Sequence, residues 1–100
     1  MAGICVGHVT HYYGDLHVAV LALEDALQVG DWLHLLGRTT DFAQPVLSLQ
    51  VNHQPVTQAG PGQLVALMVN DRVHVNDLAY RITSDEVREI EDGRVPDRSW

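Results

Sequence analysis

Turn signals recur about every 8–14 residues along this chain, and short runs of β-branched, aliphatic and aromatic residues lie between them. This spacing leaves little room for long helices and is typical of all-β domains. The clearest strand is residues 43–53, in which aliphatic and polar side chains alternate from Leu47 to Asn52. With 100 residues, 46% of them hydrophobic, the chain has the length and apolar content of a single domain.

The same pattern predicts six short strands, which cover residues 4–13, 16–23, 32–36, 43–53, 64–69 and 78–82. Gly14-Asp15 forms a reversal that joins the first two strands in a hairpin. Residues 64–69 are apolar on both faces, which predicts a central strand covered on both sides. Six such strands predict a small closed antiparallel barrel, with an open sandwich as the alternative.

Two segments interrupt this rhythm. Residues 22–29 contain several good helix formers, and we interpret them as a strand end followed by a loop with room for one helical turn. After Ile82, residues 83–100 carry six acidic residues against three arginines, a balance of −3 in a total of −7. A capping-box start at Thr83 and a stop at Gly93 predict a short helix or a disordered tail. We therefore expect a barrel over residues 1–82 and an acidic C-terminal tail over residues 83–100.

Composition excludes several kinds of chemistry. All six basic residues are arginines, so the chain has no lysine for a phosphate loop, a Schiff base or a general base. The single cysteine, Cys5, excludes an internal disulfide and a zinc site with several thiolates. The chain starts without a signal-peptide pattern and has no apolar run near the roughly 20 residues of a membrane helix. We therefore expect a cytoplasmic protein that does not contact a membrane.

No motif indicates an enzyme. The three serines lie outside any Gly-x-Ser-x-Gly sequence, and the paired acids Glu24 and Asp25 lie in a loop. The glycine-rich turn at residues 60–62 lacks the following helix that would hold a phosphate. The sequence therefore predicts a non-catalytic protein that needs no cofactor.

The six histidines raise the alternative of a metal or small-ligand site. No His-x-His pair occurs, and His8 and His11 lie three residues apart, which places them on opposite faces of a strand. The alternative that stays open is a site in the first hairpin formed by His11, Tyr12 and His17. Ordinary histidines at the surface are the competing interpretation.

Charge argues against nucleic acid as a partner. A net charge of −7 repels a phosphate backbone unless the arginines cluster, so we expect no DNA binding and no independent RNA binding. Arg38 and Arg72 lie in separate loops that a barrel could bring together. The favoured partner is a protein or a ribonucleoprotein.

Short motifs within residues 4–82 carry a family resemblance. They are residues 9–13 (VTHYY), 18–20 (VAV), 27–31 (LQVGD), 37–42 (GRTTDF), 46–51 (VLSLQV), 53–56 (HQPV) and 59–65 (AGPGQLV). With these residues the span resembles domain 2 of translation GTPases of the elongation factor Tu and initiation factor 2 type. It is similar, more closely, to small elongation-factor-like proteins and to the C-terminal domain of some collagenase-like peptidases. Asn76-Asp77 departs from the Gly-Asp of the last turn, although asparagine also tolerates a positive φ.

The resemblance implies a six-stranded closed barrel of the translation-factor domain 2 type that has no GTPase domain of its own. The expected function is a non-catalytic interaction module that docks onto a protein or ribonucleoprotein partner. Polar loops at residues 37–42 and 53–62 on a compact scaffold favour the same interpretation. The expected contact residues are Arg38, Thr40, Asp41, Phe42, His53 and Arg72. The identity of the partner and the oligomeric state stay open.

Overall fold

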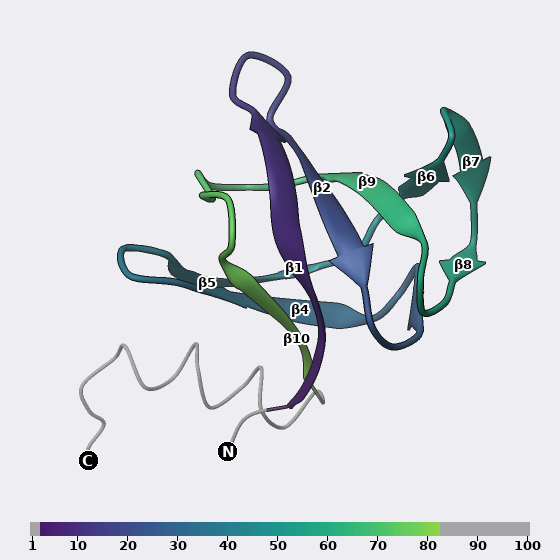
Figure 1. Cartoon of the computed structure of the whole chain (residues 1–100), viewed down its shortest axis with the longest axis horizontal. Helices are drawn as coiled ribbons and strands as arrows, with labels where there is room; N and C mark the ends of the chain where they lie inside the picture. Colours follow the sequence, from purple (N-terminus) through teal and green to yellow (C-terminus); the bar gives the residue numbers. More distant parts are fainter. Residues whose placement is uncertain (1–2, 83–100) are drawn as a thin grey trace.

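The computed structural model describes residues 3–82, which form strands and turns with no helix in this range (Figure 1). The strands are β1 (Ile4–Tyr13), β2 (Val18–Leu23), β3 (Leu27–Gln28), β4 (Trp32–Leu36), β5 (Asp41–Pro45), β6 (Leu49–Val51), β7 (Gln54–Val56), β8 (Gln58–Ala59), β9 (Leu64–Met68) and β10 (Leu78–Ile82). No helix in the described residues could span a membrane. The tail predicted at residues 83–100, as a helix or as disorder, lies outside the described residues.

Eight strands form one antiparallel sheet in the order β5-β4-β10-β1-β2-β9-β6-β7, and β3 pairs with β8 in a second sheet. The all-β, antiparallel prediction is confirmed. The closed six-stranded barrel is wrong, because the sheet has eight strands and its order ends at β5 and β7 without a pairing that closes it in residues 3–82. Both edge strands are short and contain a proline, Pro45 in β5 and Pro55 in β7.

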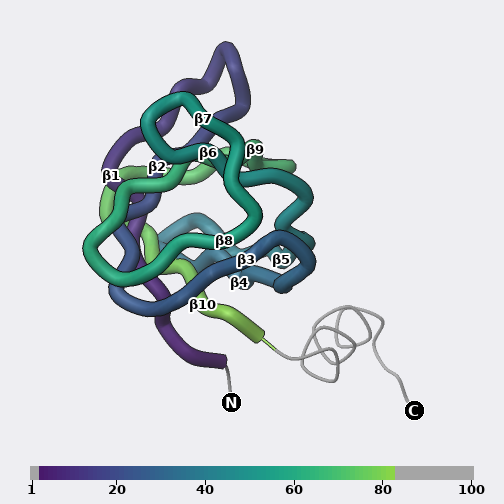
Figure 2. Tube along the Cα trace, turned by 90° about the vertical axis from the view of Figure 1, so that its right-hand side faces the viewer, coloured from purple at the N-terminus to yellow at the C-terminus, as the bar shows by residue number. Residues whose placement is uncertain are grey.

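The strands beyond the six predicted ones come from two segments in which the structure differs from the prediction. The strand expected at residues 43–53 is divided: β5 ends at Pro45 and β6 starts at Leu49. Asn52 and His53 then both adopt positive φ, 52° and 65°, which closes a two-residue turn between β6 and β7. Residues 27–28 form a strand rather than a helical turn, and β3 and β8 lie next to each other in Figure 2.

The core is almost entirely aliphatic. Alternate residues of β2 and β4 point inward, so Ala19, Leu21, Leu33 and Leu35 are at most 1% exposed. In β1 the pairing register shifts between Val9 and His11, where one extra residue enters the strand. This bulge keeps Val9 in the core while the next segment of β1 pairs with the far half of β2.

The first hairpin, β1–β2, is confirmed by direct pairing from Gly7↔Leu23 to Tyr13↔Val18. β9 is central in the sheet, between β2 and β6, as its sequence predicts. It is covered on one face only: Val65 and Leu67 are buried, whereas Leu64 is 57% and Met68 60% exposed. The predicted cover on the second face is therefore absent from the described part of the structure.

Candidate functional site

β1, β2 and β9 are neighbours in the sheet (Figure 1), and we call the side of these three strands that points away from the core the outer face. Residues directly opposite each other in an antiparallel pair point to the same side of the sheet, so the register identifies its members. They are His8, His11, Tyr13, Val18, Val20, Ala22, Leu64, Ala66 and Met68. None of them is Asp, Glu, Lys or Arg.

The exposure of the outer face is high for aliphatic side chains. Leu64 and Met68 are more than half exposed, and Tyr13 is 49% exposed. The outer-face residues of β2, which are Val18, Val20 and Ala22, are half-buried by their neighbours. His11 and Tyr13 stack at one side, with ring centroids 6.1 Å apart and planes 3° from parallel. The result is a largely apolar surface that no other described segment covers.

Charged groups lie at the two ends of the outer face. Glu24 follows β2 with its side chain 64% exposed, and its carboxylate lies 3.8 Å from His8 Nδ1. At the other end are Asp15, in the β1–β2 turn, and Asp71, in the loop after β9, both exposed. Arg72, next to Asp71, is the one arginine in this loop, which also contains His74. The border of the outer face is therefore mainly acidic.

The first hairpin does not bring its two histidines to one site. His17 lies in the turn with a positive φ of 55° and lines a hollow of about 350 Å³ with Tyr12, Asp71 and Arg72. His11 does not line this hollow and belongs to the outer face. Within residues 3–82 no cluster of three or more His, Cys, Asp or Glu side chains has the geometry to hold a metal ion.

A buried polar cluster connects the β4–β5 turn to the loop before β10, and we call it the Thr40–Asp77 cluster. The Thr40 hydroxyl, 3% exposed as a residue, donates to Asp77 Oδ2 at 2.5 Å and lies 3.2 Å from His74 Nδ1. The His74 backbone N–H donates to the same Asp77 oxygen at 2.8 Å. Gly37 completes the cluster, because a Cβ there would overlap Asp77 Oδ1. These contacts hold a carboxylate in the interior without an arginine, and the His74 Nδ1 atom lies 3.6 Å from Asp77 Oδ2.

The remaining expected contact residues occupy different environments. Asp41 is exposed and its carboxylate lies 2.6 Å from His34 Nε2. Phe42 packs against the core, and Arg38 lines a hollow of about 430 Å³ with residues 74–77. His53 lies in the β6–β7 turn, at the opposite side of the molecule from the β4–β5 turn in Figure 1. The structure thus gathers Arg38, Thr40, Asp41 and Phe42 at one turn and places His53 and Arg72 on two others.

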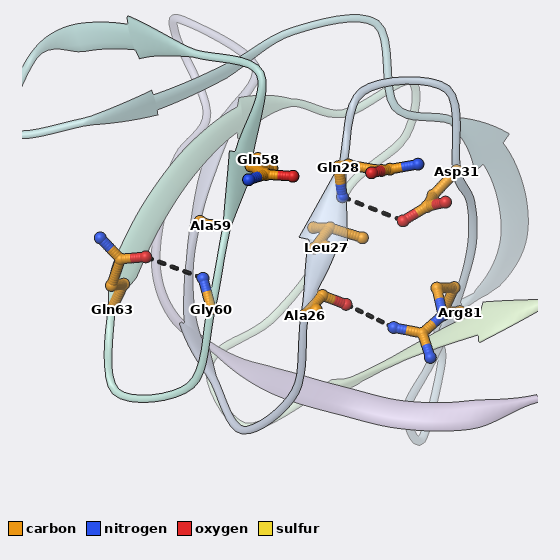
Figure 3. Close-up of a pocket in the computed structure, with 9 residues that line it drawn as sticks. All are labelled: Ala26, Leu27, Gln28, Asp31, Gln58, Ala59, Gly60, Gln63 and Arg81. Carbon is orange, nitrogen blue, oxygen red and sulfur yellow. Dashed lines mark hydrogen bonds between the residues drawn. The ribbon is translucent and has the colours of Figure 1, made fainter.

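A third hollow, of about 590 Å³, lies between β3, β8 and the end of β10 (Figure 3). We call it the β3–β8 hollow. Its lining residues are Ala26, Leu27, Gln28, Asp31, Gln58, Ala59, Gly60, Gln63 and Arg81. An Arg81 Nη atom donates to the Ala26 carbonyl at 2.5 Å, and the Gln28 N–H donates to Asp31 Oδ2 at 2.9 Å. The hollow therefore has a guanidinium, a carboxylate and three carboxamides around it.

Sequence reasoning missed both surfaces. The outer face could not be predicted, because a strand with apolar residues on both faces has the same sequence pattern whether its second face is covered or exposed. The β3–β8 hollow depends on strands of two residues each, which are too short for any periodicity. The glutamines at 28, 58 and 63 were the available signal, since each lies beside a turn.

Comparisons with known proteins give a consistent picture of the fold. No protein-family model matches the chain. Two crystal structures of the C-terminal domain of a protein described as a U32 peptidase, from Geobacillus thermoleovorans, are similar to it. One, the selenomethionine variant, has a TM-score of 0.74 and 18% identity, and covers 77% of this chain and 98% of that domain. The other has a TM-score of 0.76 and 17% identity, and covers 80% and 93% respectively.

A sequence relative comes from Methanocaldococcus jannaschii and bears the name of an uncharacterized protease. It is 33% identical over 76 residues, which are 75% of this chain and 19% of that protein. The chain therefore spans about a fifth of the length of this relative. The comparisons support the expected resemblance to a C-terminal domain of collagenase-like peptidases, and they give no support to the translation-factor resemblance.

Proposed function

We propose that this chain is a non-catalytic accessory domain that docks onto a protein partner through the outer face. The observation that carries the proposal is the continuous, uncharged and exposed apolar surface on β1, β2 and β9. Contiguous exposed apolar patches on a small domain typically mark interaction sites, because leaving them in water is unfavourable. The nine outer-face positions include no Asp, Glu, Lys or Arg, in a chain with 13 acidic residues.

The acidic ends of the outer face favour one kind of partner. Two copies of this chain would bring Glu24, Asp15 and Asp71 near one another, and like charges at an interface are unfavourable. A protein surface with an apolar centre and basic residues around it would meet the acids with opposite charge. RNA has the wrong charge for this border and offers no apolar surface of this shape.

The similarity to peptidase domains supports the same function. In the Geobacillus protein the similar domain is a C-terminal part of a peptidase, and in the Methanocaldococcus relative the similar region is a fifth of the chain. In both proteins the similar region is therefore one part of a longer chain. We therefore propose a peptidase-like chain as the partner, with this domain contributing binding rather than catalysis.

The test uses paired variants of the tagged full chain. Met68→Asp places a charge in the outer face, and Leu47→Asp places the same charge on an 80% exposed leucine elsewhere. Each protein is mixed with the purified catalytic chain of a U32-type peptidase from the same source organism, with and without ribonuclease, and complexes are separated by size-exclusion chromatography. We expect the wild type and Leu47→Asp to form a complex in both conditions, and Met68→Asp to weaken it at least about tenfold.

Three outcomes would contradict the proposal. Equal binding by Met68→Asp and Leu47→Asp would remove the outer face as the docking surface. A complex that disappears with ribonuclease would make RNA the partner. Cleavage of a peptide substrate by this chain alone, measured before mixing, would show that the domain is itself catalytic.

A further inference from the structure

We propose that the β3–β8 hollow is a binding site for an extended peptide that presents a carboxylate to Arg81. The site is separate from the outer face and goes beyond the proposed docking function, on which it does not rest. Polar groups stand around its rim, and Leu27 and Ala59, which are 1% and 8% exposed, anchor the two short strands in the core beneath it.

Arg81 supplies the charge for this recognition. Its hydrogen bond to the Ala26 carbonyl engages one of the five N–H donors of the guanidinium and fixes it at the wall of the hollow (Figure 3). No carboxylate of residues 3–82 lies within 4.0 Å of it, although this part of the chain has seven acidic residues and three arginines. A carboxylate of a ligand would accept two hydrogen bonds from a guanidinium held in this way.

The carboxamides make the ligand a peptide rather than a simple anion. Gln28 and Gln58 lie opposite each other across the β3–β8 pair, and in Figure 3 the Gln28 side chain extends away from Gln58, toward Asp31. Gln63 Oε1 accepts the Gly60 N–H at 2.7 Å, which leaves its amide nitrogen as a donor. Carboxamides present both donors and acceptors, which matches the N–H and C=O groups of an extended backbone.

Asp31 argues against a phosphate ligand. Its Oδ2 atom accepts the Gln28 N–H, and its second oxygen remains available to accept from a ligand N–H. A carboxylate on the same rim would repel a phosphate, which carries more negative charge than a carboxylate. The hollow also lacks the lysine and the helix start that commonly hold phosphate groups.

The carboxylate could be the C-terminal end of a peptide or an acidic side chain within it, and the test distinguishes these sources. The full chain, labelled with ¹⁵N, is titrated with three probes: acetyl-tetraalanine with a free C-terminus, acetyl-Ala-Ala-Glu-Ala-amide, and the neutral acetyl-Ala-Ala-Gln-Ala-amide. Inorganic phosphate is titrated in parallel. We expect one or both carboxylate peptides to shift the backbone amides of Gln28, Gln58 and Gly60 at lower concentration than the neutral peptide or phosphate.

The variants assign the interaction to Arg81. Arg81→Gln should weaken the binding of the carboxylate peptide about tenfold, whereas Arg38→Gln, which removes an arginine from another hollow, should not change it. If Arg81→Gln loses the dispersed spectrum of a folded protein, Gln58→Glu replaces it, because a second carboxylate on the rim should weaken binding by a similar factor. Met68→Asp should bind the peptide as the wild type does, so that the peptide-site proposal and the docking proposal are tested independently.

The proposal is overturned if the neutral peptide or phosphate shifts the same amides as strongly as the carboxylate peptides. It is also overturned if Arg81→Gln and Arg38→Gln behave alike, or if none of the probes shifts these amides at millimolar concentration.

Discussion

The outer face and the Thr40–Asp77 cluster reverse the usual distribution of side chains. The outer face exposes leucine and methionine to solvent, whereas the cluster buries a threonine and an aspartate. Exposed apolar groups contribute little to the free energy of folding, because they stay in water in both states. The buried carboxylate contributes much more, because its removal takes the acceptor away from two donors in the interior, the Thr40 hydroxyl and the His74 backbone N–H. The comparison separates residues that are free to serve binding from residues that hold the fold.

The largest effect should come from Asp77→Ala. The substitution leaves the Thr40 hydroxyl and the His74 N–H without their acceptor in the interior, and we expect a loss of about 3 kcal/mol in the free energy of unfolding. Urea denaturation followed by circular dichroism measures it. Asp41→Ala is the matched control, because Asp41 is 72% exposed in its pair with His34 and should cost less than about 1 kcal/mol. Equal losses for the two variants would show that the cluster has no special role.

A smaller loss, about 2 kcal/mol, is expected for Gly37→Ala, and its cause can be isolated. The three atoms nearest to the added Cβ would all belong to the Asp77 carboxylate, which the Cβ would overlap. In the Asp77→Ala background the overlap is absent, so the same substitution should then cost little. A double-mutant cycle measured by urea denaturation checks this. If the losses of the two single variants add in the double variant, the strain of Gly37→Ala lies in the backbone and not in the contact with Asp77.

The smallest effect on stability should come from Met68→Asp. Because Met68 is 60% exposed, the substitution should change the free energy of unfolding by no more than about 0.5 kcal/mol while it weakens the proposed docking. Urea midpoints of the variant and of Leu47→Asp should agree within this range. A loss comparable to that of Asp77→Ala would mean that the outer face supports the fold, and would remove the contrast between the two regions.

Much of the fold follows from sequence because the pattern is strong where strands are long. The β1–β2 hairpin and the strands at residues 32–36 and 78–82 are located correctly by alternation and turn residues. The division of residues 43–53 was missed, because the Asn52-His53 turn has no glycine although both residues adopt positive φ. Alternation also cannot tell whether the second apolar face of a strand is covered, and the exposure of Leu64 and Met68 therefore required the structure.

The candidate sites were less predictable than the fold, since they depend on segments far apart in the chain. Thr40 and Asp77 are 37 residues apart, and nothing in either loop indicates that they meet. Arg81 donates a hydrogen bond to Ala26, which is 55 residues away in the sequence. The sequence of residues 78–82 around it is that of an ordinary strand, with no sign of this contact. Hydrogen bonds of this kind depend on how all the strands pair in the sheet. No single short strand indicates that pairing, so these contacts cannot be predicted from the local sequence.

The prolines in the two edge strands have a consequence for aggregation. An exposed sheet edge is a template on which further chains can add strand by strand, and an apolar face next to it would stabilise the resulting fibre. Pro45 and Pro55 each remove a backbone donor from an edge, and the edge strands are only five and three residues long. The molecule can therefore present leucine and methionine to a partner while its edges resist polymerisation.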